Sequence, residues 1–245
     1  MFRFIDGTIG KWLRHFFFAI VRTYFGLFYN VSCSNKHLLQ DLQGALILAT
    51  HVSRFDGPLI AAILYTTQRI RPVVHYNEYN NWMQWFPLFV ARAIPVSSPR
   101  TWSPERREAQ KKKAMSLILA ALDRDESILL FPAGHTRQQP AEVIAPHLSG
   151  ARDILQTNPE RPVLVLRLDG LGKFQPARYD YFWTFIGIKR GRRHISVDLR
   201  RVDDLDPNMD LATFNQRLED RLNTPIAETF GACRTDNPAL PAAHD

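Results

Sequence analysis

The hydrophobic and polar positions along the chain follow two patterns in turn. Short apolar runs predict buried strands, and longer stretches with helical periodicity predict helices. The predicted strands are Ala45–Thr50, Arg71–Tyr76, Ala93–Ser97, Ser127–Phe131, Pro162–Leu168 and Ile195–Arg200. In the last of these, Ile195–Arg200, hydrophobic and polar residues alternate, as in an edge strand. The predicted helices are Pro58–Thr67, Trp82–Val90 (helix or loop), Pro104–Asp123, His147–Gln156 and Leu211–Glu228. This order predicts an α/β fold in which helices cover a single mixed sheet.

An aromatic-rich segment, Lys11–Val31, precedes the first predicted strand. On a helix, nine apolar side chains share one wide face: Leu13, Phe16, Phe17, Ile20, Val21, Tyr24, Leu27, Phe28 and Val31. Arg14, His15 and Arg22 interrupt the stretch, whereas a membrane span needs roughly 20 mostly apolar residues. No small-residue cleavage site follows, so it is not a secretory signal. We expect either a helix in the lipid headgroup layer or a helix packed on the core.

The remaining organisation follows from length and composition. The chain has 245 residues, of which 45% are hydrophobic and 22% charged, values typical of a folded protein. We predict an N-terminal amphipathic, membrane-associating helix over 1–34, one domain over 35–230 and a flexible tail over 231–245. Cys33 and Cys233 lie far apart without a C-x-x-C pair, and the histidines lack metal-ligand spacing. The sequence therefore predicts neither a disulfide scaffold nor a metal site.

The charge balance narrows the choice of partners. The formal net charge is +7, which favours an anionic partner: nucleic acid, a membrane surface or a phosphorylated substrate. The basic residues form no recognised nucleic-acid-reading motif, so we expect no nucleic acid.

The first chemical motif follows the first predicted strand, in the run Thr50–Pro58 (THVSRFDGP). His51 stands at the carboxyl end of a buried strand, where open α/β sheets place their ligands. Gly57 and Pro58 indicate that the next helix begins only after Asp56, so that the intervening loop can fold the carboxylate onto the imidazole. A carboxylate that orients one ring nitrogen makes the other a general base. The alternative is that Asp56 only caps the helix.

The second motif follows the strand Ser127–Phe131 and reads FPAGHTR. A strand that ends in Pro-x-Gly makes a tight turn that exposes backbone N–H groups. Thr136 and Arg137 follow this turn as donors suited to phosphate.

The two motifs together resemble the glycerolipid acyltransferases, the lysophosphatidic-acid-acyltransferase-like family. That family carries H-x-x-x-x-D and, some 70–80 residues later, F-P-E-G-T-R; here Phe131 comes 80 positions after His51. The resemblance covers roughly Gly44–Leu168. Thr50 stands where Asn is usual, Ala133 replaces the usual Glu, and His135 is inserted before Thr136. A third family motif is approximated by Ala93–Arg100, with its Arg displaced by two positions.

The resemblance implies a glycerolipid-acyltransferase-like fold and a membrane-associated O-acyltransferase. Such an enzyme moves a fatty acyl group from acyl-CoA or acyl carrier protein to the hydroxyl of a lysophospholipid such as 1-acylglycerol-3-phosphate. His51 is then the general base, held by Asp56. The implied substrate-binding residues are Phe131, Pro132, Gly134, Thr136, Arg137 and Arg100. An acyl thioester is already activated, so we expect no cofactor. We expect a peripheral (monotopic) protein on the cytoplasmic face of the cell membrane, with membrane lipids as partners.

Three other functions remain open at this stage. The acceptor could be a non-glycerophosphate lysolipid, for example a lyso-ornithine lipid. The protein could be a thioesterase or esterase in which the His/Asp pair activates Ser53 or water. It could also be a lipid-binding module without catalysis.

Two surface features also have two interpretations each. The run Lys111–Lys113, with Arg106 and Arg107, is either a solvated helix face or a docking site for an anionic headgroup, a coenzyme A phosphate or an acidic carrier protein. The aromatic stretch Trp82–Phe89 packs in the core, or it lines an acyl groove or touches the bilayer.

Overall fold

The computed structural model describes residues 8–38, 43–52, 56–64, 69–79, 82–96, 102–136, 141–170 and 193–225. The strands in these ranges are β1 (Tyr29–Ser34), β2 (Leu46–Ala49), β3 (Ile70–His75), β4 (Ile94–Val96), β5 (Ser127–Leu130), β6 (Val163–Asp169) and β7 (Arg193–Val202). The helices are α2 (Thr8–Phe28), α4 (Asp56–Leu64), α5 (Tyr76–Tyr79), α6 (Trp82–Val90), α7 (Pro104–Leu122), α8 (Gly150–Thr157) and α10 (Leu211–Asn223).

The strands of the described residues form one mixed sheet in the order β1-β7-β6-β2-β5-β3-β4. The strands from β6 to β4 run parallel, β7 is antiparallel to β6, and β1 is parallel to β7. This arrangement confirms the predicted α/β fold with a single mixed sheet. The short apolar strand β2 lies at the centre and is buried along its whole length, as expected of a parallel strand covered on both faces.

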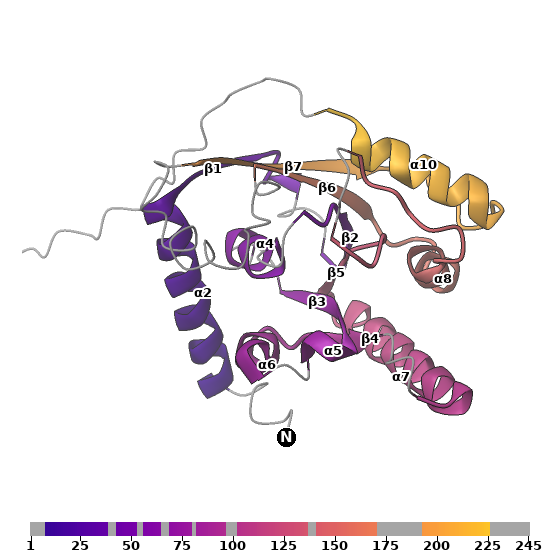
Figure 1. Ribbon diagram of the computed structural model, residues 1–245, viewed down its shortest axis with the longest axis horizontal. Coiled ribbons are helices and arrows are strands. Elements are labelled where there is room, and N and C mark those ends of the chain that lie inside the picture. Colours follow the sequence, from indigo (N-terminus) through magenta and orange to yellow (C-terminus); the bar gives the residue numbers. More distant parts are fainter. Residues whose placement is uncertain are drawn as a thin grey trace, which may run out of the picture.

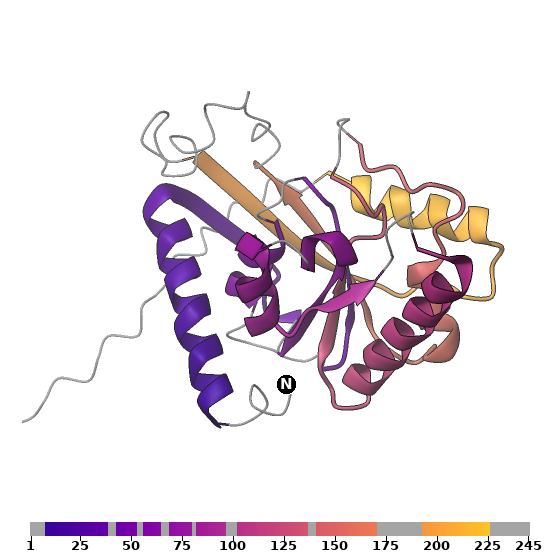
Figure 2. The ribbon, with the colours of Figure 1, turned by 60° about the horizontal axis from the view of Figure 1, so that its bottom comes forward.

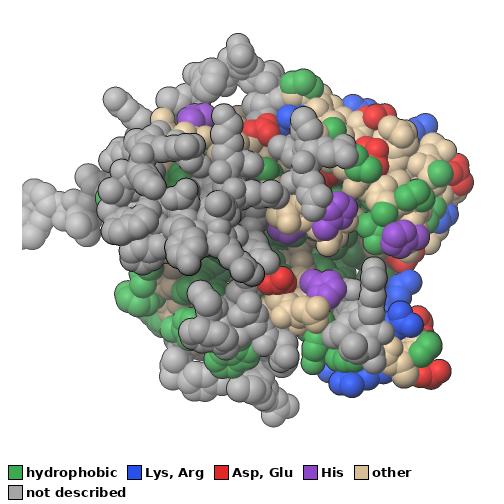
Figure 3. Space-filling model, viewed as in Figure 1, with side chains coloured by type: hydrophobic (Ala, Val, Ile, Leu, Met, Phe, Trp, Pro, Cys, Tyr) green, Lys and Arg blue, Asp and Glu red, His purple; other side chains and the backbone are tan. Residues whose placement is uncertain are grey.

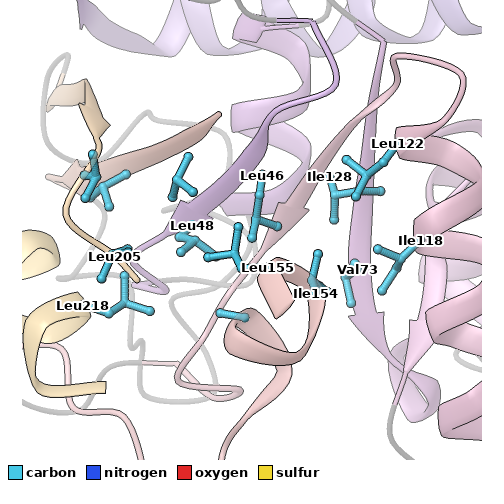
Figure 4. Close-up of a cluster of buried hydrophobic side chains, with 14 of the residues drawn as sticks. Leu46, Leu48, Val73, Ile118, Leu122, Ile128, Ile154, Leu155, Leu205 and Leu218 are labelled. Atoms are coloured by element: carbon cyan, nitrogen blue, oxygen red, sulfur yellow. The ribbon is translucent and has the colours of Figure 1, made fainter. Parts of the chain in front are cut away.

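Helices cover both faces of the sheet (Figures 1 and 2). Helices α7, α8 and α10 pack on one face, around a cluster that includes Leu46 and Leu48 of β2 (Figure 4). Helices α2 and α4 pack on the other face against Ile47 and Ala49, and α6 lies beside α2. Successive residues of β2 therefore supply two separate hydrophobic layers, because side chains alternate across a strand.

The N-terminal helix differs from the prediction at its C-terminal end. It ends at Phe28, and Tyr29–Ser34 form β1, which pairs with β7. Consequently β7, expected at an edge, lies between β6 and β1. The segment Tyr29–Ser34 can satisfy its backbone groups only through a strand more than 150 residues away, and helical periodicity gives no sign of that partner.

Helix α2 is apolar on two sides rather than on one wide face. Phe18 and Phe25 are buried towards the domain. Trp12, Phe16, Ile20 and Leu27 are exposed, the first two at 72% and 67%. The helix therefore packs on the core and also leaves large hydrophobic side chains outside. In the part of the chain that the structure describes, no helix is long and apolar enough to span a membrane.

Most other elements confirm the prediction with shifted ends. Ser103 caps α7 as expected, with its hydroxyl accepting from the Arg106 backbone N–H at 3.3 Å. The stretch Trp82–Val90 is a helix, α8 begins at Gly150 rather than His147, and α10 ends at Asn223. The predicted division at 34/35 stays a prediction, and the predicted tail 231–245 lies outside the described residues.

Candidate active site

The carboxyl end of β2 carries the predicted histidine and carboxylate in contact. Nδ1 of His51 lies 3.0 Å from Oδ2 of Asp56, and the same oxygen accepts the Val52 backbone N–H at 2.5 Å. Asp56 is the first residue of α4 and is fully buried, whereas the His51 side chain is 23% exposed. A carboxylate accepts but does not donate, so Nδ1 of His51 carries the proton. In the neutral ring, Nε2 is therefore free of a proton and can act as a base.

Two buried polar residues fix the strand end from which His51 projects. The Thr50 hydroxyl accepts the Leu168 N–H at 2.8 Å and donates to the Leu168 carbonyl at 3.4 Å. The buried carboxylate of Glu142 accepts the backbone N–H of His51, at 3.4 Å from each of its oxygens. Thr50 thus ties β2 to β6, and Glu142 holds the backbone of the histidine itself.

The second motif forms a turn beside His51, because the motif follows β5 and β5 is paired with β2. The Phe131 ring stacks on the His51 imidazole, with 4.4 Å between ring centroids. The Gly134 N–H donates to the Phe131 carbonyl at 3.0 Å, and Gly134 has a φ of +69°, which L residues rarely adopt. Pro132 and Ala133 are buried beneath this turn. Ala133 stands where the glycerolipid acyltransferase motif has Glu. This position therefore contributes no charged group to the site.

A cavity of about 280 Å³ opens beside the His51 ring. Its polar end is lined by His51 and the turn residues Phe131, Gly134, His135 and Thr136. Its apolar part is lined by residues of α2, α4 and α6 and by the residue that follows α6: Phe17, Phe18, Pro58, Ala61, Pro87, Leu88 and Ala91. The cavity therefore joins a general-base candidate to a hydrophobic wall, a combination that suits a substrate with a reactive polar centre and an apolar chain.

Two residues in the cavity wall were missed by the sequence analysis. His75, the last residue of β3, and Glu78 in α5 line the same cavity as His51. Figure 3 shows several histidine side chains close together on one face of the molecule. A signal for His75 was present, because it lies near the carboxyl end of the predicted strand Arg71–Tyr76, and His51 directly follows the predicted strand Ala45–Thr50. Glu142 offered no comparable signal, since it stands in a segment without helical or strand periodicity.

The structure brings together six of the predicted site residues: His51, Asp56, Phe131, Pro132, Gly134 and Thr136. Arg137, Arg100 and Ser53 lie outside the described residues, and the catalytic and binding roles of all these residues stay predictions. Within the described ranges, no group of three His, Cys, Asp or Glu side chains could hold a metal ion.

Comparisons with known proteins give a family and a fold. The acyltransferase family matches the chain over residues 30–166. A similar solved structure is that of the 1-acyl-sn-glycerophosphate (LPA) acyltransferase PlsC from Thermotoga maritima, with a TM-score of 0.57 and 12% sequence identity. The match covers 90% of this chain and 83% of PlsC. No curated protein gives a significant match. The family match spans more than half of the chain and includes both motifs, and the chain therefore belongs to the acyltransferase family and is an acyltransferase.

Proposed function

We propose that the protein is a membrane-associated O-acyltransferase for lysophospholipids. It transfers a fatty acyl group from acyl-CoA or acyl carrier protein to a hydroxyl of a lysolipid such as 1-acylglycerol-3-phosphate. The observation that carries this proposal is the His51–Asp56 pair, at 3.0 Å, at the polar end of a cavity with an apolar wall. The activity in the name of PlsC, a protein with a similar fold, supports the same acceptor.

The residues present can perform the transfer without a covalent enzyme intermediate. Nε2 of His51 takes the proton of the acceptor hydroxyl as its oxygen attacks the thioester carbon, and Asp56 stabilises the imidazolium that forms. The new C–O bond gives a tetrahedral oxyanion. When this intermediate collapses, the C–S bond breaks and the leaving thiolate takes the proton back from Nε2. The products are the diacylated lipid and a free thiol.

The apolar part of the cavity provides a binding surface for an acyl chain. Phe17 and Phe18 of α2 and Leu88 of α6 offer a hydrophobic wall next to the reacting centre. An acyl chain that leaves water for this wall gains about 0.8 kcal/mol for each buried CH₂ group. Binding of the acyl chain at this wall leaves the thioester carbon near His51.

Membrane association is supported by the outer surface of α2 and the neighbouring α6. The exposed side chains Trp12, Phe16, Ile20 and Leu27 of α2 lie on the side away from the core, and Trp85 and Phe86 of α6 are 40% and 45% exposed. Phe86 contacts Phe17, which lines the cavity, with 6.1 Å between ring centroids. This apolar surface therefore continues to the cavity, so a lysolipid can pass from a bilayer to His51. We place the protein peripherally on the cytoplasmic face, where thioester donors are available.

Basic side chains are available to bind the anionic groups of the two substrates. Arg137, which follows the Thr136 turn, and Arg100 are proposed to bind the acceptor's phosphate, because Arg matches phosphate geometry. Arg106, Arg107 and Lys111–Lys113 are exposed on α7 and suit the phosphates of coenzyme A or an acidic carrier protein.

The test is product analysis with the pure full-length chain. Labelled acyl-CoA or acyl carrier protein is incubated with a panel of lysolipids, including 1-acylglycerol-3-phosphate and a lyso-ornithine lipid, and the products are separated by mass. We expect a diacylated phospholipid in the wild type, and a rate lowered about 10²–10⁴-fold in His51→Ala. Hydrolysis of the thioester at the same rate without any acceptor would show a thioesterase instead. Equal transfer by His51→Ala and wild type would refute the role of His51.

A further inference from the structure

The wall of the cavity carries a second imidazole whose proton position is fixed by the backbone. Nδ1 of His75 lies 3.2 Å from the backbone nitrogen of Asn77. A backbone N–H can only donate, so Nδ1 of His75 must accept. The neutral ring therefore carries its proton on Nε2, and His75 contributes a hydrogen-bond donor to the cavity that it lines.

The sheet places His75 close to the level of His51, two strands away along the sheet. Leu48 of β2 pairs with Leu130 of β5, and Leu129 of β5 pairs with Pro72 of β3. Continuing this register places His75 within one residue of the level of His51 at the same edge. Adjacent strands lie about 4.8 Å apart, so β2 and β3, on either side of β5, are about 10 Å apart.

The shared cavity gives a reacting carbonyl group access to both imidazoles. The acceptor hydroxyl must lie about 3 Å from Nε2 of His51 for its proton to be transferred. The attacked carbon bears the carbonyl oxygen on its other side, and a donor to that oxygen must also lie about 3 Å away. Because both imidazoles line one cavity beyond the strand ends, a carbonyl group held there has His51 on the side of the attacking hydroxyl and His75 as a donor to its oxygen.

We propose that His75 is a catalytic residue whose neutral Nε2–H donates to the carbonyl oxygen of the acyl thioester and stabilises the tetrahedral oxyanion. This inference rests on the proposed acyl transfer. As the acceptor oxygen attacks, the carbonyl π electrons move to the oxygen, and the hydrogen bond from His75 strengthens. When the C–S bond breaks, these electrons restore the carbonyl, and His75 keeps its proton throughout. A neutral imidazole in this role acts as an electrophile rather than as a base.

His135 lines the same cavity with the opposite hydrogen-bond polarity. Its Nδ1 lies 2.7 Å from the Ala133 carbonyl oxygen, which only accepts, so Nδ1 carries the proton. The neutral Nε2 of His135 therefore accepts, whereas that of His75 donates. Both rings line the cavity, but only His75 has the polarity that an oxyanion needs.

The experiment compares kcat and both KM values of wild type, His75→Ala, His75→Gln and His147→Ala, with acyl-CoA and the best acceptor from the lysolipid panel. We expect His75→Ala to lower kcat about 10²–10³-fold, the usual loss for one oxyanion donor, with little change in either KM. His75→Gln keeps an N–H donor, and its kcat should be at least tenfold higher than that of His75→Ala. His147→Ala, at an exposed histidine that is not in the cavity lining, should keep a kcat within about threefold of wild type.

Two outcomes would overturn the assignment. One is a His75→Ala enzyme with wild-type kcat, and the other is a variant in which only the acceptor KM rises, which would make His75 a headgroup-binding residue. Circular dichroism and the urea midpoint show whether each variant is folded; His75 is exposed, so truncation leaves no core cavity. If wild type transfers acyl groups and His51→Ala does not, a normal His75→Ala refutes this inference alone. Absence of transfer by wild type refutes the proposed function itself.

Discussion

Both carboxylate oxygens of Glu142 lie 3.4 Å from the backbone nitrogen of His51, although the two residues are 91 positions apart in the chain. Glu142 is itself held by α10, because the Asn223 side chain accepts its N–H at 2.7 Å and donates to its carbonyl at 2.9 Å. Helix α10 thus positions the backbone of the proposed base through one buried carboxylate.

Replacing Glu142 should therefore affect both stability and transfer. Glu142→Ala leaves the His51 N–H without this acceptor, which costs about 1–3 kcal/mol of unfolding free energy. We expect kcat to fall about tenfold because His51 is less well held, since misplacement of a catalytic group is costly. Glu142→Gln retains an acceptor oxygen and should lie between Ala and wild type. Urea unfolding and steady-state transfer measure the two effects.

Glu219 supplies the control for this prediction. Its carboxylate accepts the Ile144 N–H at 2.6 Å and so holds the same segment, but it has no recorded contact with His51. Glu219→Ala should reduce the urea midpoint and leave kcat near wild type. A kcat loss as large as that of Glu142→Ala would show that the whole segment, and not the carboxylate at His51, is what matters.

Asp56→Asn tests the orientation of the His51 ring. Oδ2 of Asp56 accepts from both His51 Nδ1 and the Val52 N–H. An amide oxygen in this place can still accept both hydrogen bonds, but it carries no negative charge to stabilise the imidazolium. We expect transfer to fall about 10²–10⁴-fold while the circular dichroism spectrum is kept. Asp153→Asn, a change at the first turn of α8 outside the cavity, should keep full activity. Retained activity in Asp56→Asn would exclude the carboxylate from the mechanism.

Gly134→Ala tests the backbone of the turn beside His51. A Cβ there would meet only Leu148 Cδ1 at 3.9 Å, so the penalty comes from the φ of +69° and not from crowding. We expect a loss of about 1–2 kcal/mol in unfolding free energy. Gly170→Ala should destabilise the fold more strongly, because its Cβ would lie 2.2 Å from the His194 carbonyl oxygen. Equal losses in the two variants would contradict this ranking.

Substitution of the outer face of α2 tests membrane docking without removing the helix from the core. The variant Trp12→Ser/Phe16→Ser/Ile20→Ser changes only exposed side chains. Vesicle affinity should fall about tenfold for each aromatic side chain removed, because burial of such a side chain contributes about 1.5–3 kcal/mol. Co-sedimentation with vesicles containing phosphatidylglycerol measures this. Val143→Ser, another exposed apolar position, is the control, and unchanged binding of the triple variant would refute docking through α2.

The start of α10 gives a prediction for the pH dependence of stability. Hydrogen bonds from the Thr213 side chain and backbone to Asp210 lower the pKa of this carboxyl below its usual value. Because the folded pKa is the lower one, the stabilisation is present above the unfolded pKa of about 3.9 and is lost as pH falls through the folded value. Urea midpoints between pH 7 and pH 2 should therefore fall less steeply in Asp210→Asn than in wild type. Parallel curves for the two proteins would show that Asp210 does not contribute to this acid sensitivity.

Much of the fold follows from patterns within short stretches of sequence. The apolar run of β2, the Ser103 cap of α7 and the turn that requires Gly134 each depend on residues a few positions apart. The contact of His51 with Asp56 was also predicted, because one strand end and one helix start fix both residues.

Contacts between distant segments could not be derived in this way. The pairing of β1 with β7 and the approach of Glu142 to His51 depend on which strands and helices become neighbours. His75 faces the same cavity as His51 only because β5 lies between β3 and β2.

The sequence by itself therefore determined the α/β alternation, the contact of His51 with Asp56 and the apolar character of α2. The tertiary structure alone decided the order of the strands, the division of α2 into a buried and an exposed side, and the neighbours of His51. The physical reason is that periodicity, caps and turns arise from local backbone geometry, whereas strand order depends on which long-range pairing buries the most apolar surface and satisfies the backbone hydrogen bonds.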